Sequence, residues 1–283
     1  MVRRFLLCAA LFAAAACSGI PDLDLVNMVL PLGVDVNTRV AESLAWDEAN
    51  APVNINVAPV GYRFAVCSDV HANPGEKPQR FSAFMNGDYG EFYLMLGDLV
   101  GKTGGMDVAY SEMAGTTGFV VVGNHDLFFH NWEAWRQYFN TSTYYFTVTS
   151  TASKDLFIML DSASGTLGEK QTDWLRGVFR DIRPGCDRCF VATHTNILKT
   201  DNSQTPSNNF PLEETWLLLD LFARNGVSAV FTGHDHCRDV SVFNGVTYVT
   251  LDDIKDSTPN ASYLMVSVPA NPADACSLTF KEF

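Results

Sequence analysis

Basic residues are scarce in this chain. Its 283 residues include 19 Lys and Arg against 32 Asp and Glu, a formal net charge of −13, and the sequence pI is about 4.7. Proteins that bind the phosphate backbone of nucleic acids usually carry a basic surface. The composition therefore argues against nucleic acid as a partner, although metal ions held by the protein would add local positive charge.

Long apolar runs are also scarce, and the one at the N-terminus has the features of an export signal. Two arginines precede the apolar residues 5–16, which are too few to span a bilayer comfortably. Ala14–Cys17 is similar to a bacterial lipobox, although Ala14 stands where Leu is usual; an ordinary signal peptide is the alternative. We therefore predict a signal peptide over residues 1–17. A lipid anchor at Cys17 would be the one link to a membrane. The predicted location is the bacterial cell envelope (lipid-anchored, periplasmic or surface) or the outside of the cell.

Cysteine usage fits export only in part. Cys186 and Cys189 form a C-x-x-C segment just before a predicted strand, where a disulfide could close a turn. The chain has no second C-x-x-C, which argues against a zinc knuckle. A thiol-redox role is a weaker alternative, because redox pairs usually open a helix. We expect either a structural disulfide or two inert thiols.

Histidine is scarce too, but five of the six histidines lie in short polar segments that each follow an apolar, strand-like run. The segments are Asp69-Val70-His71, Gly97-Asp98, Gly123-Asn124-His125-Asp126, Thr193-His194 and Gly233-His234-Asp235-His236. Carboxylates, amide oxygens and imidazoles are ligands of first-row divalent metals. Because open α/β sheets form their sites at the carboxyl ends of strands, the five segments predict one shared metal site.

Taken in order, these segments resemble the motifs of the calcineurin-like metallophosphoesterase family. The family pattern is D-x-H, G-D, G-N-H-D or G-N-H-E, a lone His, and G-H-x-H, and every part is present between Asp69 and His236. The resemblance implies an α/β (α+β-like) fold in which two packed β-sheets are flanked by helices, a four-layer sandwich. We assign residues 57–283 to this domain and residues 18–56 to an N-terminal extension packed against it.

The resemblance also implies a role for each polar motif residue. Asp98 would bridge two divalent metal ions (manganese, iron or zinc), because a carboxylate offers two oxygens. His125 would lie over the substrate phosphate and protonate the leaving oxygen, while Asp126 would fix the tautomer of His125 and keep it cationic. The remaining ligands would be, for one ion, Asp69, His71 and His236 and, for the other, Asn124, His194 and His234.

These implied roles describe a binuclear metal-dependent phosphoesterase that hydrolyses a phosphomonoester or phosphodiester by metal-activated water, outside the cytoplasm. Its substrate would be a phosphorylated small molecule or a component of the envelope. The alternative is a catalytically silent metal-binding or scaffold protein with the same fold. Degenerate relatives typically lose several ligands, and here none is missing, which favours the enzyme.

Two subfamilies fit less well. Purple acid phosphatases carry D-x-G as the first motif and a Tyr three residues after the Asp of G-D, whereas this chain has His71 and Gly101 at those positions. Cyclic-nucleotide phosphodiesterase relatives usually have G-H-H-P around the lone His. Here that segment is Thr193–Asn196, which argues against a cyclic nucleotide as the substrate.

Outside the motifs, periodicity and turn residues predict the remaining elements. Helices are expected near residues 79–85, 107–114, 132–139, 169–182 and 213–225. Alternating runs predict strands at residues 143–149, 156–161, 240–243, 246–251, 263–268 and 278–283.

Four local expectations concern less regular stretches. Alternating apolar residues predict a half-buried strand over 34–40, followed by a short helix over 41–49. Thr166 is predicted to cap the helix after it, and Asp161 to be an ordinary surface or loop residue. The polar residues 199–209 are expected to form a mobile loop that borders the metal site.

Overall fold

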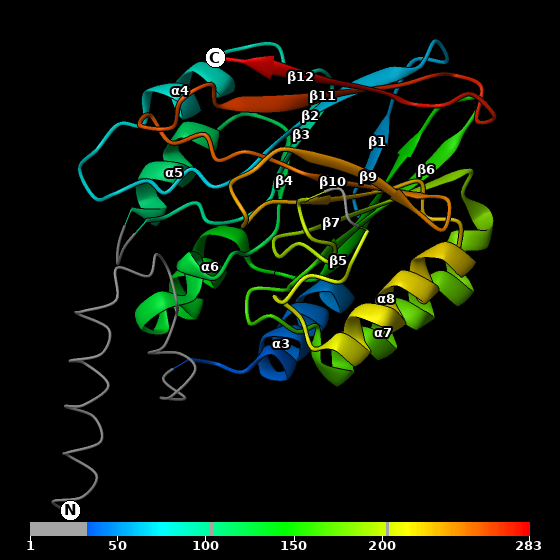
Figure 1. Cartoon of the computed structure of the whole chain (residues 1–283), viewed down its shortest axis with the longest axis horizontal. Helices are drawn as coiled ribbons and strands as arrows, with labels where there is room; N and C mark the ends of the chain where they lie inside the picture. The colour runs from blue at the N-terminus through cyan, green and yellow to red at the C-terminus, as the bar shows by residue number, and fades with distance from the viewer. Residues whose placement is uncertain (1–32, 102–104, 202–203) are drawn as a thin grey trace, which may run out of the picture. The chain divides into compact units, whose positions relative to one another are not determined.

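Residues 33–101, 105–201 and 204–283 are described by the computed structural model (Figure 1). The predicted signal peptide, its Cys17 and the first part of the predicted extension lie outside these residues. Within the described residues, no helix is both long enough and apolar enough to cross a membrane.

The strands form two mixed sheets. The large sheet has seven strands in the order β1 (Asn54–Asn56), β5 (Tyr144–Thr149), β6 (Lys154–Leu160), β7 (Arg188–Thr193), β8 (Ala229–Thr232), β10 (Val246–Thr250) and β9 (Asp239–Phe243). The small sheet has five strands in the order β12 (Ser277–Glu282), β11 (Ser262–Val268), β2 (Tyr62–Cys67), β3 (Phe92–Met95) and β4 (Gly118–Val120). Neighbours β2, β3 and β4 are parallel, as are β6, β7 and β8.

Helices lie on the outer faces of both sheets. They are α3 (Val36–Ala49), α4 (Gln79–Met85), α5 (Met106–Met113), α6 (Trp132–Phe139), α7 (Gly168–Asp181) and α8 (Leu212–Arg224), with short 3-10 helices at His125–His130 and Arg183–Gly185. The five helices predicted between the motifs are thus confirmed to within one residue at each end.

Side-chain alternation along each strand explains the four layers. In β2, Phe64 and Val66 enter an aromatic core between the two sheets, while Ala65 and Cys67 face a second core shared with α4, α5 and α6. In β7, Phe190 faces the central core in the same way, and the opposite face of the large sheet packs against α7 and α8. The strands are apolar on both faces because each sheet is covered on both sides. The predicted sandwich is confirmed, with helices outside and two sheets inside (Figure 1).

The strand predicted over residues 34–40 is wrong, because this stretch begins helix α3. The carboxylate of Asp35 accepts hydrogen bonds from the backbone amides of Asn37 (3.0 Å) and Thr38 (3.2 Å), which caps the first turn. Val36 and Val40 are four residues apart, so they share a face on a helix as well as on a strand, and both are buried. The apolar pattern alone could not separate the two conformations, and the cap decides between them.

The prediction that Asp161 is an ordinary surface or loop residue is only partly right, because Asp161 lies in the loop after β6 but is not on the surface. Its carboxylate is fully buried and receives two hydrogen bonds from the Arg39 guanidinium, Nε to Oδ2 at 2.8 Å and Nη2 to Oδ1 at 2.9 Å. Arg39 is buried as well and lies on α3. Residues 33–56 lie in the same compact unit as the sheets, which runs from Gly33 to Phe283.

Two further local expectations differ in part from the structure. The Thr166 hydroxyl accepts from the backbone amide of Gly168 (3.1 Å), the first residue of α7, as a cap would, and donates to the Glu214 carboxylate (2.7 Å). The residue directly before α7 is Leu167, which forms no side-chain cap. In the predicted mobile loop, the described residues are held by backbone hydrogen bonds, from Lys199 N–H to Thr205 O (3.0 Å) and from Ser207 N–H to Ile197 O (2.8 Å). The Thr166 contact depends on Glu214, which is distant in sequence, whereas the loop is held by bonds between its own residues and their near neighbours.

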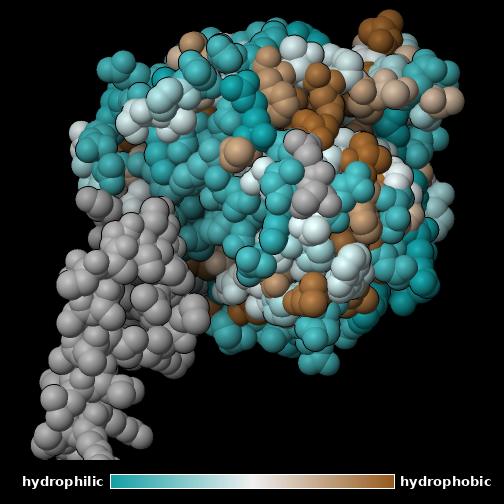
Figure 2. Space-filling view, viewed as in Figure 1, coloured by the Kyte–Doolittle hydropathy of each residue, from teal (hydrophilic) through white to brown (hydrophobic). Residues whose placement is uncertain are grey.

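The surface matches the acidic, polar composition. Figure 2 shows one face covered mostly by hydrophilic side chains, with apolar ones gathered in its upper right part. Large exposed apolar side chains include Val240 and Val242 on the edge strand β9 and Trp216 on α8. Most large apolar side chains are buried in the three cores.

Candidate metal centre

The five motif segments follow the ends of five strands from both sheets. Two segments, containing Asp69 and Asp98, follow β2 and β3, and the third follows β4, all in the small sheet. The segments with His194 and His234 follow β7 and β8 of the large sheet. Since these neighbours are parallel within each sheet, their carboxyl ends converge, and the structure brings all seven predicted ligands together.

One group of potential ligand atoms comes from Asp69, His71, Asp98 and His236, with all four atoms within 4.8 Å of one another. The Nε2 atom of His236 lies 3.0 Å from Asp69 Oδ1 and 3.3 Å from His71 Nε2. The Nε2 atom of His71 lies 3.7 Å from Asp98 Oδ2. These are the residues expected to hold one ion.

A second group is formed by Asp98, His194 and His234, whose ligand atoms also lie within 4.8 Å of one another. His194 Nε2 is 3.4 Å from Asp98 Oδ1. The amide oxygen of Asn124 lies 3.0 Å from both His194 Nε2 and His234 Nδ1, so it joins this group. The two oxygens of Asp98 thus face different groups.

The electrostatics of both groups suit bound cations. Asp69 and Asp98 are buried together, and burial, followed by the charge of Asp69, raises the pKa of Asp98 well above its usual range. Burial lowers the pKa of His71 and of His234 to about 4, so both imidazoles are neutral at pH 7, the form that binds metals. Asp69 and Asp98 thus lie buried beside the neutral His71 and His234, where a bound metal ion would favour the ionised form of both carboxyl groups.

Groups behind the ligands fix two of the imidazole rings. His194 Nδ1 lies 2.7 Å from the carbonyl oxygen of Leu96. A carbonyl only accepts, so Nδ1 carries the proton and Nε2 faces Asp98 with its lone pair. His236 Nδ1 lies 3.3 Å from Asp253 Oδ2, so its Nε2 faces Asp69. Such outer partners orient metal-binding histidines in many sites.

The backbone of the site is held in an unusual conformation. Five predicted ligands have positive φ angles between 50° and 70°, namely Asp69, His71, Asp98, His234 and His236. Non-glycine residues adopt this conformation infrequently, and it concentrates at functional sites. Gly233 allows the closest approach: a Cβ there would lie 1.9 Å from Ser68 Oγ and 2.5 Å from Asp69 Oδ2. The glycine of G-H-x-H is therefore a steric requirement of the site.

His125 reaches the site, and the Asp126 carboxylate binds backbone amides of the neighbouring loops. His125 Nε2 lies 4.0 Å from Asp98 Oδ2, and its Nδ1 lies 3.2 Å from the carbonyl oxygen of Gly101. The buried Asp126 carboxylate accepts from the backbone amides of Gly123 (2.9 Å) and Val100 (3.2 Å). Asp126 thus joins the loops that carry Asp98 and His125; its role in fixing the His125 tautomer stays a prediction.

Two charged residues beside the site, Asp253 and Lys255, were not predicted from the sequence. Lys255 Nζ lies 3.4 Å from His236 Nδ1 and 3.4 Å from Asp253 Oδ2. Both follow β10, the parallel neighbour of β8 in the large sheet. The available signal was again a charged residue just beyond an apolar strand, in Leu251-Asp252-Asp253. No family motif marks this position, so only the fold shows that it reaches the site.

The C-x-x-C segment has no feature of a redox centre. Cys186 and Cys189 are both buried free thiols, which leaves the inert-thiol alternative rather than the disulfide. Burial raises the pKa of both thiols, that of Cys189 to about 12. Reactive thiols have a lowered pKa, so this environment argues against thiol-redox chemistry.

Comparisons with solved structures show the same fold at low sequence identity. GAP50, described as the anchor in the inner membrane complex of Plasmodium, aligns with a TM-score of 0.55 and 14% identity over 78% of this chain and 84% of that one. A putative 5'-nucleotidase of Staphylococcus aureus aligns with a TM-score of 0.51 and 14% identity, over 77% of this chain and 54% of that one. The purple acid phosphatase of yellow lupin aligns with a TM-score of 0.53 and 11% identity, over 78% of this chain and 51% of that one. The chain thus spans about half the length of the last two proteins.

The comparison by sequence identifies the family. A comparison with curated proteins found no match. The family model described as Metallophos, calcineurin-like phosphoesterase, matches residues 62–238, which is more than half of the chain and contains all five motif segments. The protein therefore belongs to the calcineurin-like phosphoesterases and is, by enzyme class, a phosphoester hydrolase.

Proposed function

We propose that this protein is a binuclear metal-dependent phosphoesterase that acts on a phosphorylated small molecule outside the cytoplasm. The observation that carries the proposal is the position of Asp98. Its Oδ2 faces His71 at 3.7 Å and its Oδ1 faces His194 at 3.4 Å, so one carboxylate joins two separate groups of potential ligands. A shared carboxylate is what a site for two neighbouring ions needs.

The donor set fits manganese, iron or zinc, since imidazole and carboxylate ligands suit all three. Asp69, His71 and His236 would hold one ion, while the other would be held by Asn124, His194 and His234, with Asp98 between them. Divalent ions bound there supply Lewis-acid activation of water and neutralise charge on the phosphoryl group.

His125 is proposed to supply the proton for the leaving oxygen. The Gly101 carbonyl lies 3.2 Å from its Nδ1, so Nδ1 carries a proton and Nε2 is directed to the Asp98 side of the site. When Nε2 is also protonated, the ring can stabilise a phosphoryl oxygen and then transfer this proton. Asp126 supports the loop that positions His125 through its bonds to Gly123 and Val100.

The substrate class and the location are proposed on separate grounds. Structural relatives include a putative 5'-nucleotidase and a purple acid phosphatase, which favours a phosphorylated small molecule; an envelope component fits the same chemistry. Export is supported by the signal-like residues 1–17, with Cys17 as the candidate lipid anchor.

The proposal is tested by stripping the protein of metal and reloading it with manganese, iron or zinc. We expect release of p-nitrophenol from p-nitrophenyl phosphate or its bis ester only after reloading, and the preferred ester narrows the substrate. Asn124→Ala and His125→Ala variants should lose this release. Two ions bound per chain without release from either ester or from a panel of phosphorylated metabolites would favour the catalytically silent alternative.

Metal affinity should also depend on Asp253. Replacing Asp253 with Asn weakens the acceptor that orients His236 at 3.3 Å, and the loss of such outer partners typically lowers metal affinity about 10- to 100-fold. The matched control is Asp252→Asn at the preceding residue, whose carboxylate bonds Arg238 and Ser262 instead. Competition with a metal-sensitive dye measures both affinities. Equal losses in the two variants would rule out a specific role for Asp253.

A further inference from the structure

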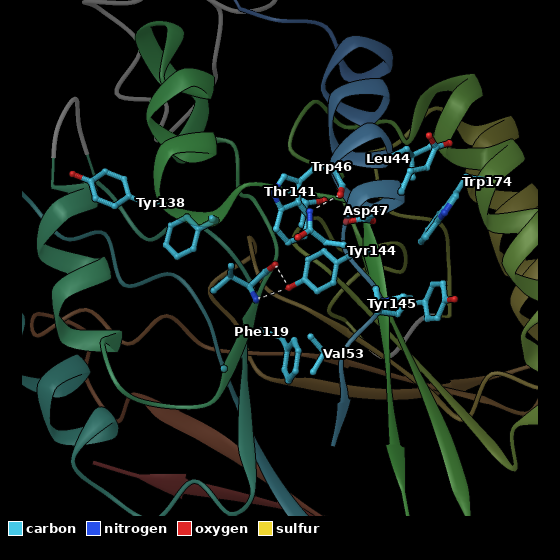
Figure 3. A pocket seen from close by; sticks show the side chains of 17 residues that line it. Leu44, Trp46, Asp47, Val53, Phe119, Tyr138, Thr141, Tyr144, Tyr145 and Trp174 are labelled. Carbon is cyan, nitrogen blue, oxygen red and sulfur yellow. Dashed lines mark hydrogen bonds between the residues drawn. The ribbon is translucent and has the colours of Figure 1, made fainter. Parts of the chain in front are cut away.

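A second concavity lies apart from the metal centre, beside the first residues of β4 (Figure 3). Its volume is about 490 Å³, within the usual range for small-molecule sites. The wall comes from the C-terminal half of α3, the start of β5, the end of α6 and Trp174 on α7. Gly118 and Val120 of β4 line it, whereas the predicted ligand Asn124 follows the other end of that strand. The described lining includes none of the predicted metal ligands.

Aromatic rings make up much of this wall. Six of them are labelled in Figure 3: Trp46, Phe119, Tyr138, Tyr144, Tyr145 and Trp174. The Tyr144 hydroxyl donates to Val120 O at 2.8 Å and accepts from Val120 N–H at 2.9 Å, which fixes its position between the two sheets. The wall is thus built from rings that are partly held in place before a ligand arrives.

The charge of the wall is acidic. Asp47 and Glu48 line the cavity, and its described lining contains no Lys, Arg or His. Burial raises the pKa of Asp47 to about 7, against a hydrogen bond from Thr141 that lowers it. The Asp47 charge also raises the pKa of Tyr144 and of Tyr145, after burial, so it lies close to both rings. Among the described residues of this lining, Asp47 therefore has no basic side chain as its counter-ion.

We propose that this cavity binds a small quaternary ammonium compound, with Asp47 as its counter-ion and aromatic rings of the wall, Tyr145 and Trp174 among them, beside the ammonium group. Aromatic faces attract cations through their quadrupoles, and methylated ammonium groups are the ligands that such cages recognise. The carboxylate adds direct charge attraction in a partly desolvated place. A neutral molecule of the same shape would leave Asp47 unpaired.

The test is a calorimetric titration of the full-length, metal-loaded protein with choline and with 3,3-dimethylbutan-1-ol, which has carbon in place of the nitrogen. At pH 8 we expect choline to bind and the neutral alcohol to bind about tenfold more weakly or worse. Because the cation favours ionised Asp47, choline affinity should fall as the pH drops below about 7.

Variants separate this site from a general attraction to an acidic protein. Asp47→Asn should weaken choline binding about tenfold, and Trp174→Ala should weaken it as well. Asp173→Asn, which removes an exposed carboxylate paired with Arg176 on α7, should leave it unchanged, and circular dichroism checks that each variant is folded. Equal binding of choline and the alcohol, no binding of choline, or full affinity in Asp47→Asn would each overturn the proposal.

Discussion

Replacing Asp98 with Asn is expected to lower phosphoester turnover by about a thousandfold, because a single side chain serves both groups of potential ligands. Its carboxylate oxygens face His71 and His194, and the backbone amide of His125 donates to Oδ1 at 2.9 Å. Asn keeps an acceptor for that amide but loses the negative charge and the second oxygen ligand. We therefore expect the variant to fold but to lack the side chain that both groups of potential ligands share.

The measurements are kcat and metal content of the same preparation. We expect Asp98→Asn to hold fewer than two ions and to unfold at nearly the wild-type temperature. Asp88→Asn is the matched control, since Asp88 is exposed and contacts the Arg63 guanidinium and the backbone amide of Gly90, away from the metal ligands; the turnover of this variant should be unchanged. Wild-type kcat in Asp98→Asn would exclude the proposed bridge.

Replacing Arg39 with Met is expected to lower the free energy of unfolding by about 3–5 kcal/mol. The guanidinium is 2% exposed and the Asp161 carboxylate 0% exposed, so the variant leaves a buried charge without its partner. Arg39 also donates to Ser164 Oγ at 3.0 Å and to the carbonyl oxygen of Val34 at 2.5 Å, and these bonds are lost as well.

Urea unfolding monitored by circular dichroism gives the free energies. Arg63→Met is the matched control, because the same substitution breaks an exposed ion pair with Asp88, 47% and 59% exposed, and should cost less than about 1 kcal/mol. Adding Asp161→Asn to Arg39→Met should recover part of the loss by removing the unpaired charge. Similar losses in the two single variants would mean that α3 contributes little to the stability of the sheets.

The motif residues could be predicted from the sequence because each depends on local order. A strand places its next few residues at its carboxyl end, so Asp69, Asp98 and His194 were recognisable from the apolar runs before them. The helices could be predicted in the same way, since their apolar residues recur with the helical period of 3.6 residues per turn.

The contacts of Asp161 and Asp126 could not be predicted from the sequence, because they involve other elements of the fold. The burial of the loop residue Asp161 was not recognisable, because its partner Arg39 is 122 positions away. Asp126 stands next to His125, yet bonds the backbone amides of Gly123 and Val100. Neither pairing leaves a periodic pattern in the chain, because each depends on how separate elements pack.

By itself, then, the sequence determined the ligand types, their places after apolar strands and the family to which the chain belongs. Only the tertiary structure decided that the ends of β2, β3 and β4 in one sheet meet those of β7 and β8 in the other. It also decided that Asp253 lies behind His236 and that Asp47 lies in an aromatic cavity. The physical reason is that side-chain periodicity records which face of an element is buried, whereas the packing of the whole chain selects what covers that face.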